Sequence, residues 1–581
     1  MIGDRLDLAL AAPDPALRRG RFRLKLVAGL FALLFAGLGF RLLHLAPDEP
    51  AVEVAAPARV PEEPARRRPD LVDRRGELLA TDLRVPSLAA DPTLVADPKR
   101  TAERLARIVP GLDAESLERR LAQAKAAGRR FAWVDHRVTP QVQRAVLEAG
   151  LPGILVRHAE HRVYPKGASA GHLLGFVDVD NKGLAGFEHA LDHGRASGLR
   201  GLGRVALSID LRIQEVVRDE LARAAREFRP IGACGLVLDI RTGELLALVS
   251  LPDFDPNLAA RARAEQRKNR CTGGTYELGS VFKVLSLAAA LDSGKVRPLQ
   301  RFEIPPALKI GRHRIRDVHR ARRPYSVAEI FSHSSNIGTA LAVFAAGGAE
   351  PLKSMLGRLG LFERAPIELL EVARPQLQRN WPDVVTATVS FGHGIAVSPL
   401  RFAEAVASLA GDGTLVRATL LKYPEGSAPA PGPRIASRRT VEELRWMMWL
   451  TVADGTAKKA AVPGYLVGGK TGTADKAGRG GYRKGAVLAS FVGVFPLDDP
   501  RYLVLVVVDE PKASAASGGT RYGGQVAAPV VAAITARIGP LLGVRPSDPT
   551  LEARYRERLQ ALKATAALAS ETRLAALDAR P

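Results

Sequence analysis

Tyr276-Glu277-Leu278-Gly279-Ser280-Val281-Phe282-Lys283 stands directly before a helix-forming run at 284–291. Ser280 at the start of that helix and Lys283 three residues later share one helical face, so the lysine nitrogen can reach the hydroxyl. A free lysine, with a pKa of about 10.4, is a poor base at neutral pH. Burial and the positive end of a helix both favour its neutral form, so the pattern predicts Lys283 as the base that activates Ser280. Taken alone the motif is weak, because a capping serine followed by a solvated lysine also fits it.

Two further motifs follow in chain order. Ser334-Ser335-Asn336 comes after a predicted helix at 327–331 and offers a second hydroxyl and an amide for proton transfer and for holding a peptide. Lys470-Thr471-Gly472-Thr473 lies on a predicted strand and offers a cation, room for a substrate backbone, and a hydroxyl with its backbone N–H. Separately, a helix cap and a surface hairpin would explain them. All three in this order predict a serine acyl-enzyme site.

Apolar runs around these motifs predict an antiparallel sheet interrupted by a helical subdomain. Strands are predicted at 233–240, 245–251, 465–474, 486–495 and 502–510. The turns that join neighbouring strands are short, which implies antiparallel pairing, and the stretch 281–452 between the two groups is mainly helical. Ahead of this unit, residues 71–203 mix short strands with amphipathic helices at 101–108 and 114–127. That pattern predicts a separate α+β module of limited core.

The amino end predicts an uncleaved membrane anchor. A cluster of Arg and Lys at 18–25 leads into residues 26–45, which supply the about 20 residues of a spanning helix if Arg41 and His44 reach the interface. A cleaved signal peptide is the alternative, but Pro47, Asp48, Glu49 and Pro50 stand where small residues would be required. The basic flank predicts a cytoplasmic amino terminus and an extracytoplasmic remainder.

The length of 581 residues leaves room for several folding units, and six segments are predicted. They are a cytoplasmic tail (1–25), the transmembrane anchor (26–45), a Pro- and Ala-rich tether (46–69), a non-catalytic pedestal domain (70–204), the catalytic domain (205–545) and a helical carboxy-terminal tail (546–581).

Composition restricts the partners. Lys and Arg number 84 against 61 Asp and Glu, a net charge of +23, which fits either an anionic partner or basic residues spread over the surface. Placement outside the membrane excludes nucleic acid and leaves wall polymer or lipid. Cys234 and Cys271 are predicted as small buried hydrophobes, with one disulfide left open. No metal and no cofactor are predicted, because His158 and His161, spaced like a helical pair, have no acidic or Cys partner.

With these motifs the chain resembles the class B penicillin-binding proteins, most of all their division-specific members. The resemblance also includes Arg68, Arg162-x-Tyr164-Pro165, Glu188, Ser390-Phe391-Gly392-His393-Gly394 and Tyr522-Gly523-Gly524. Leu278, where many relatives carry Pro, departs from the pattern without removing a catalytic group. The resemblance implies an α+β chain with a single amino-terminal transmembrane helix, a dimerisation-type pedestal and a penicillin-binding transpeptidase domain.

The same resemblance implies a peptidoglycan D,D-transpeptidase that cross-links stem pentapeptides during septum formation and releases D-alanine. Ser280 would be the nucleophile and Lys283 its base, with Ser334 and Asn336 moving the proton and holding the donor peptide. Lys470, Thr471, Gly472 and Thr473 would bind the substrate, and the N–H groups of Ser280 and Thr473 would form the oxyanion hole. A β-lactam would acylate Ser280.

Implied partners are glycan strands derived from lipid-linked precursor, β-lactams, a SEDS-family glycosyltransferase and other divisome proteins at the inner membrane. Three alternatives stay open. An elongation-type class B enzyme would share every motif. A β-lactamase would need a Glu-x-x-Leu-Asn pattern, which is missing between Asn336 and Lys470. A β-lactam sensor would need a cytoplasmic domain, and about 25 residues are too few to fold alone. His333 and His393 are predicted as pocket walls rather than proton carriers.

Overall fold

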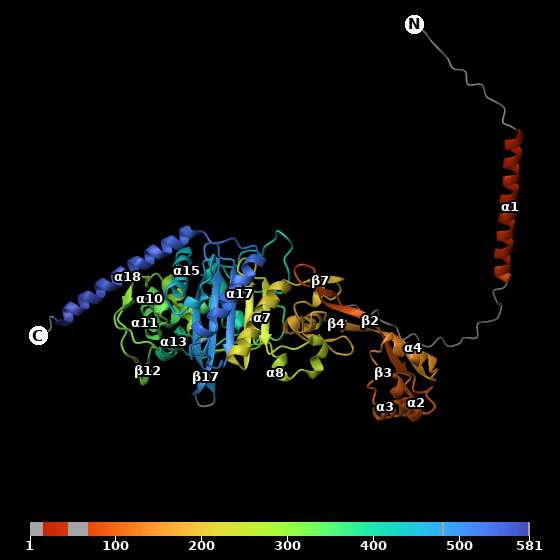
Figure 1. Ribbon diagram of the computed structural model, residues 1–581, viewed down its shortest axis with the longest axis horizontal. Helices are drawn as coiled ribbons and strands as arrows, with labels where there is room; N and C mark the ends of the chain where they lie inside the picture. Colours follow the sequence, from red (N-terminus) through yellow and green to blue (C-terminus); the bar gives the residue numbers. More distant parts are fainter. Residues whose placement is uncertain (1–14, 45–67, 479–480, 579–581) are drawn as a thin grey trace, which may run out of the picture. The chain divides into compact units, whose positions relative to one another are not determined.

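The computed structural model describes residues 15–44, 68–478 and 481–578 (Figure 1). The first segment is a single helix, α1 (Pro15–His44), whose stretch Phe22–Arg41 is long and apolar enough to cross a membrane and is not buried against protein. The predicted anchor lies in this helix up to His44. Residues 1–14 of the predicted tail and 46–67 of the predicted tether lie outside the described residues.

A five-stranded sheet organises the chain after the predicted tether. Its strands are β1 (Asp70–Val72), β2 (Leu78–Ala90), β3 (Ala132–Asp135), β4 (Ile154–Val163) and β7 (Arg204–Ala206). The order is β3-β2-β1-β7, and β4 pairs with β2. The amphipathic faces of α2 (Pro98–Ile108), α3 (Ala114–Ala126) and α4 (Pro140–Glu148) enclose a small core of their own with this sheet. The helical spacing read for His158 and His161 was wrong, because both lie on β4.

Strand β7 continues the sheet across the predicted boundary between residues 204 and 205. It pairs in parallel with β1, with Leu71 opposite Val205 and Val72 opposite Ala206. The chain then enters α7 (Leu211–Phe228), capped by Asp210. Backbone pairing, rather than a linker, therefore joins the pedestal to the catalytic part.

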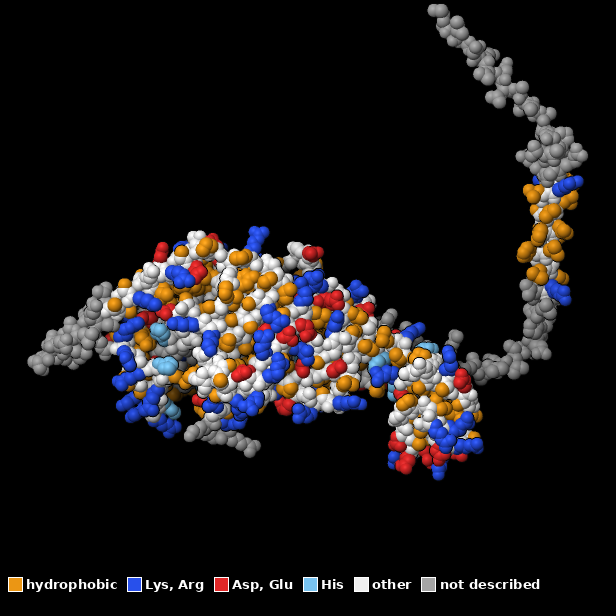
Figure 2. Space-filling model, viewed as in Figure 1, with side chains coloured by type: hydrophobic (Ala, Val, Ile, Leu, Met, Phe, Trp, Pro, Cys, Tyr) orange, Lys and Arg blue, Asp and Glu red, His pale blue; other side chains and the backbone are white. Residues whose placement is uncertain are grey.

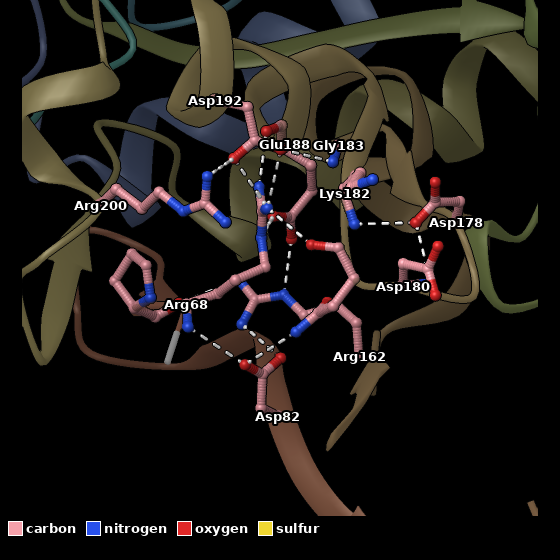
Figure 3. A network of polar contacts seen from close by, with 12 residues as sticks. Arg68, Asp82, Arg162, Asp178, Asp180, Lys182, Gly183, Glu188, Asp192 and Arg200 are labelled. Carbon is pink, nitrogen blue, oxygen red and sulfur yellow. Dashed lines mark hydrogen bonds and ion pairs between the residues drawn. The ribbon is translucent and has the colours of Figure 1, made fainter. Parts of the chain in front are cut away.

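A buried ion-pair network stabilises the part of the chain around the first sheet, from Arg68 to Asp192 (Figure 3). Arg68 and Arg162 converge on the two oxygens of Glu188, at 2.8 and 2.7 Å. Arg68 also pairs with Asp192 at 2.9 Å, and Arg162 pairs with Asp82 on β2 at 3.2 Å. All five side chains are at most 4% exposed. Glu188 and Asp192 lie on α6 (Gly186–His193), so the network ties that helix to β2, β4 and the first described residues of the region.

The catalytic part is built on a second five-stranded sheet, antiparallel throughout, in the order β16-β17-β18-β8-β9. Its strands are β8 (Gly232–Asp239), β9 (Leu245–Leu251), β16 (Gly468–Gly478), β17 (Gly481–Phe495) and β18 (Tyr502–Asp509). The five predicted strands correspond to these. Strand β18 pairs with β8, although more than 200 residues separate the two strands in sequence. This pairing joins the hairpin β8–β9 to the later strands β16, β17 and β18 in one sheet.

Both faces of this sheet are covered by helices. On β18, Val504, Val506 and Val508 point into the core formed with α7 and α17 (Ala528–Leu541). The intervening Leu503, Leu505 and Val507 point into the opposite core, which contains α9 (Lys283–Asp292), α14 (Pro399–Ala410) and α15 (Arg438–Ala453). A strand buried on both faces reads as a continuous apolar run, as β18 does. The apolar stretch Gly523–Leu541 is 56% buried in this packing, as expected of a core helix.

The helical subdomain contains α10 (Val327–Ser332), α11 (Asn336–Ala346), α12 (Ala349–Arg358) and α13 (Asp383–Ser390). Three short strand pairs that the sequence pattern does not predict come before α10 and on either side of α13: β10 (Arg301–Phe302) with β13 (Tyr325–Ser326), β11 (Leu308–Ile310) with β12 (His313–Ile315), and β14 (Gln376–Leu377) with β15 (Ile395–Ala396). Strands of two or three residues are too short to establish a period of two. The tail forms α18 (Pro549–Asp578), which rests on α15 through Tyr555 and Trp449.

The two cysteines correct one prediction. Cys234 on β8 and Cys271 are buried, as expected, but they form a disulfide with Cα atoms 5.4 Å apart. The favoured interpretation as unpaired hydrophobes was wrong because the loop after β9 brings Cys271 back beside β8, a proximity that sequence spacing does not reveal.

Candidate active site

Ser280 lies on the 3₁₀ turn η4 (Gly279–Phe282), which leads directly into α9. The turn begins at Gly279 in the left-handed region (φ 61°) and packs against β16, where an added Cβ would come within 2.9 Å of Ala474. A side chain at position 279 would therefore be strained and crowded. The close contact between η4 and β16 sets Ser280 next to the Lys470-Thr471-Gly472-Thr473 strand.

Lys283 is fully buried, and its side-chain nitrogen is surrounded by oxygen atoms of the first two motifs. Nζ lies 3.0 Å from Ser280 Oγ and 3.1 Å from Ser334 Oγ. It donates hydrogen bonds to the Ser334 carbonyl and to Asn336 Oδ1, both at 2.7 Å. A neutral amine has two N–H donors and one lone pair. The two shortest contacts use the donors and leave the lone pair available to the Ser280 proton.

The electrostatic surroundings favour that neutral form. Burial lowers the pKa of Lys283 well below its usual value, the nearby Lys470 ammonium lowers it further, and Asp317 opposes this by raising it. A lysine in this state can accept a proton near neutral pH, as a general base for a serine hydroxyl requires.

The Ser334-Ser335-Asn336 turn has an unusual backbone. Ser334 adopts a left-handed conformation (φ 62°), which costs roughly 1–2 kcal/mol for a residue with a side chain. Ser335 caps α11 by accepting a hydrogen bond from the amide of Gly338 at 2.8 Å. The capping role considered for this motif therefore belongs to Ser335, and the turn directs Ser334 and Asn336 toward Lys283.

Strand alternation divides the third motif into two pairs. Thr471 and Thr473 line the cleft. Lys470 and Gly472 occupy the alternate positions of the strand: Lys470 is fully buried with Nζ 5.8 Å from the Phe331 ring centre, on the side of Lys283, whose pKa it lowers. A Cβ on Gly472 would lie 2.3 Å from Ser490 Oγ and 2.7 Å from the Leu278 carbonyl. The glycine is thus required by the packing of η4 and β17 against β16, and not only by substrate approach. Burial lowers the pKa of Lys470 to about 7.

These residues meet at an open cleft of about 900 Å³. Ser280, Ser334, Asn336, Thr471 and Thr473 line it, together with His333 and His393. Both histidines are at the wall, as predicted, and burial lowers the pKa of each. The imidazole of His393 packs edge-on against the Tyr482 ring, and Tyr482 donates a hydrogen bond to Glu277 at 3.0 Å.

Sequence reasoning missed Asp317 and Thr456 as supports of this cleft, and it quoted Gly523 for the family resemblance without a role. Asp317 accepts hydrogen bonds from Ser335 Oγ and from the Asn336 amide, both at 2.5 Å. Thr456 shares a hydrogen bond with Thr471 at 2.7 Å, and the Gly523 amide donates to Thr473 Oγ1 at 2.9 Å. For Asp317 the available signal was its position as the single acidic residue in the basic stretch 308–323.

Comparison with known proteins agrees with this geometry. The family model described as the penicillin binding protein transpeptidase domain matches residues 233–536, and the penicillin-binding protein dimerisation domain matches residues 63–205. The chain is 40% identical over 536 residues to the probable peptidoglycan D,D-transpeptidase FtsI of Caulobacter vibrioides, covering 90% of this chain and 89% of that one. It is 30% identical to the peptidoglycan D,D-transpeptidase FtsI of Escherichia coli K12, covering 82% and 84%.

Solved structures support the fold. The apo form of penicillin binding protein 3 from Mycobacterium tuberculosis superposes with a TM-score of 0.64 at 23% identity, over 83% of this chain and 98% of that one. The predicted α+β class is confirmed by this match and by the two family models. The chain belongs to the penicillin-binding proteins, with the dimerisation and transpeptidase domains that define class B.

Proposed function

We propose that this protein is a peptidoglycan D,D-transpeptidase of cell division that uses Ser280 as its nucleophile. The observation that carries the proposal is the position of Lys283 Nζ, 3.0 Å from Ser280 Oγ and within 3.1 Å of oxygen atoms of Ser334 and Asn336. The similarity to FtsI of two organisms supports both the reaction and the division role.

In the proposed acylation, Ser280 Oγ bonds to the carbonyl carbon of the penultimate D-Ala of a stem pentapeptide. Its proton passes to the neutral Lys283 amine, and the carbonyl electrons move to the oxygen. Collapse of this intermediate breaks the bond to the terminal D-alanine, which leaves with a proton relayed through Ser334. An amine of a neighbouring stem then attacks the ester, releases a proton and restores the Ser280 hydroxyl. The net result is one cross-link and one free D-alanine.

The remaining predicted residues have supporting roles in this proposal. The N–H groups of Ser280 and Thr473 serve as the oxyanion hole, because preformed donors stabilise charge that develops on the carbonyl oxygen. Thr471 and Thr473 face the cleft and bind the donor peptide, while Asn336 holds its backbone. Lys470, with Thr473, provides the positive charge for the terminal carboxylate of that peptide: a bound carboxylate favours the charged form of the lysine and offsets the effect of burial. Gly472 keeps β16 close to η4.

The location and partners are also part of the proposal. The helix α1 anchors the protein in the inner membrane, with the basic end cytoplasmic and residues 70–204 as a pedestal for the catalytic domain at 205–545. The apolar stretch Phe22–Arg41 supports the anchor. A SEDS-family glycosyltransferase and other divisome membrane proteins are the expected partners, and glycan strands with stem pentapeptides are the substrate.

Labelling with a fluorescent penicillin tests the proposal. The wild-type protein should form a stable adduct, and Ser280→Ala should form none. Ser286→Ala is the matched control, because Ser286 lies one turn and a half further along and its hydroxyl donates to the Phe282 carbonyl rather than to a residue of the cleft. A labelled Ser280→Ala protein would refute the nucleophile. An adduct that disappears within seconds would indicate a β-lactamase, and rescue of elongation rather than division in a depletion strain would indicate the elongation-type enzyme.

A further inference from the structure

A strongly basic segment borders the cleft. Residues 308–323 contain seven Lys or Arg and a single acidic residue, Asp317. Six of these cations are exposed, and we call them the basic rim: Lys309, Arg312, Arg314, Arg316, Arg320 and Arg322. Figure 2 shows Lys and Arg side chains gathered at the end of the molecule where Figure 1 labels β12.

Folding does not account for these charges. The neighbouring Arg301 and Arg323 both pair with Glu329, at 3.3 and 2.6 Å. In contrast, the rim cations form no ion pair with any residue that the structure describes. Lys309 stands directly opposite Arg314 in the β11–β12 register, and like charges in that relation destabilise a strand pair. Because Lys309 and Arg314 repel each other and neither has an acidic partner among the described residues, their charges point to a binding role rather than a structural one.

The rim is held in a fixed position relative to the nucleophile. Alternate residues of the hairpin, Leu308, Ile310 and Ile315, pack into a cluster with Ile337 of α11 and Phe391. Asp317 then ties the end of the segment to the amides of the Ser334-Ser335-Asn336 turn. The next residues, Val318 and His319, line the same cleft as Ser280. A peptide or glycan chain that leaves the cleft past Val318 and His319 therefore passes beside the basic rim.

We propose that the basic rim binds carboxylate groups of the acceptor stem peptide. This inference rests on the proposed function, in which the donor peptide already occupies the cleft as an acyl-enzyme and a second peptide must approach its ester. Stem peptides carry free carboxylates, and a cluster of unpaired cations raises the local concentration of such an anion. The site would act on the second half of the reaction and leave acylation unaffected.

Two other anionic partners fit the rim less well. A membrane-binding surface places apolar side chains beside its cations, but within 308–323 Val318 is the sole large apolar residue that is highly exposed. Single-stranded nucleic acid requires aromatic side chains for base stacking, and this segment contains none of Phe, Tyr or Trp. A carboxylate-bearing peptide requires only the cations.

The test uses the full chain in detergent micelles, acylated beforehand with penicillin so that the donor position is filled. Soluble uncross-linked glycan strands with stem peptides are titrated, and binding is measured at low and high salt. Arg312→Glu/Arg314→Glu/Arg316→Glu should bind at least about tenfold more weakly than wild type and with a smaller salt dependence. A second titration uses glycan strands whose carboxylates have been converted to amides. The wild type should bind these amidated strands as weakly as the triple variant binds unmodified strands.

Arg226→Glu/Arg438→Glu/Arg439→Glu is the matched control. It makes the same change in net charge at three exposed arginines outside the rim, and its affinity should stay within about twofold of wild type. Arg314→Gln, which removes the repulsion with Lys309, gives a milder variant with an intermediate loss and carries the test if the triple variant does not fold.

Binding to vesicles of anionic phospholipid is measured in parallel. Three results would overturn the inference: unchanged affinity for the strands in both rim variants, equal binding of amidated and unmodified strands, or a loss of binding that appears only with the vesicles. Failure of the proposed function would look different, because wild-type protein would then not retain penicillin at all. Penicillin uptake by the rim variants should proceed to completion, and a block of uptake in Arg314→Gln would assign the rim to acylation instead.

Discussion

Asp317 accepts a hydrogen bond from the backbone amide of Asn336 at 2.5 Å. Through this contact a residue outside the three motifs holds one of them. The same carboxylate accepts from Ser335 Oγ and from the Ile337 amide, so it binds the first turn of α11 at three points. A negative charge at a helix amino terminus is favourable, which stabilises this arrangement. The geometry around Lys283 thus depends on a side chain that makes no contact with Ser280.

Asp317→Asn should slow acylation by about 10- to 100-fold, because an amide supplies weaker acceptors and the Ser334 and Asn336 side chains lose their position. Stopped-flow measurement of penicillin acylation checks this. Asp454→Asn is the control: Asp454 also lines the cleft but pairs with Lys458 and Lys563, so its rate should stay within about twofold. Equal rates in the two variants would contradict the positioning role.

The buried Lys470 should make stability depend on pH. Its pKa is about 7 in the folded protein and 10.5 as a free side chain, so between these values the unfolded chain binds more protons. Stability therefore rises with pH over that interval by up to about 1.4 kcal/mol per unit from this group, and the penalty is complete below pH 7. Lys470→Met should remove this slope.

Native-state hydrogen exchange of β17 amides, followed from pH 7 upward, measures the effect. Lys476→Met serves as the control, because Lys476 lies on β16, the same strand as Lys470. Lys476 pairs with Asp509 at 2.7 Å, and burial, which lowers its pKa, is outweighed by the Asp509 and Glu510 carboxylates, which raise it. Its removal should leave the slope in place. If Lys470→Met kept the wild-type slope, another group would be responsible.

Glu188→Ala should destabilise the pedestal by about 3–5 kcal/mol, because Arg68 and Arg162 would remain buried without their shared partner. Glu77→Ala removes an exposed pair with Lys166 and should cost less than about 1 kcal/mol. Hydrogen exchange of β2 and β4 amides gives both values. Penicillin labelling should survive in each variant, and a pedestal as stable in Glu188→Ala as in wild type would show that the network contributes little.

The Cys234–Cys271 disulfide should contribute about 4 kcal/mol, since it joins residues 37 positions apart and restricts the unfolded chain. Denaturant unfolding of Cys234→Ala/Cys271→Ala should show this loss and should no longer respond to a reducing agent. In the folded wild type both sulfurs are buried, so a reductant should act only after unfolding. A variant as stable as the oxidised wild type would contradict the prediction.

Several elements were predictable because their signals are local. The five sheet strands appear as apolar runs between turn residues, and α2 and α3 appear through their three-and-four spacing. The short pairs such as β11–β12 were not predictable, since two or three residues carry no period. The disulfide likewise depended on where a loop returns to the sheet.

The sequence by itself determined the family, the order of the three motifs, the α+β class and the residues that the structure later brings together at the cleft. Only the tertiary structure decided that Lys283 reaches Asn336 across 53 residues, that Lys470 is buried beside Phe331 and close enough to Lys283 to lower its pKa, and that Asp317 braces the second motif. The physical reason is that spacing along a chain fixes which side chains share one helix or strand face. Contacts between elements arise from packing and register, which bring distant residues together.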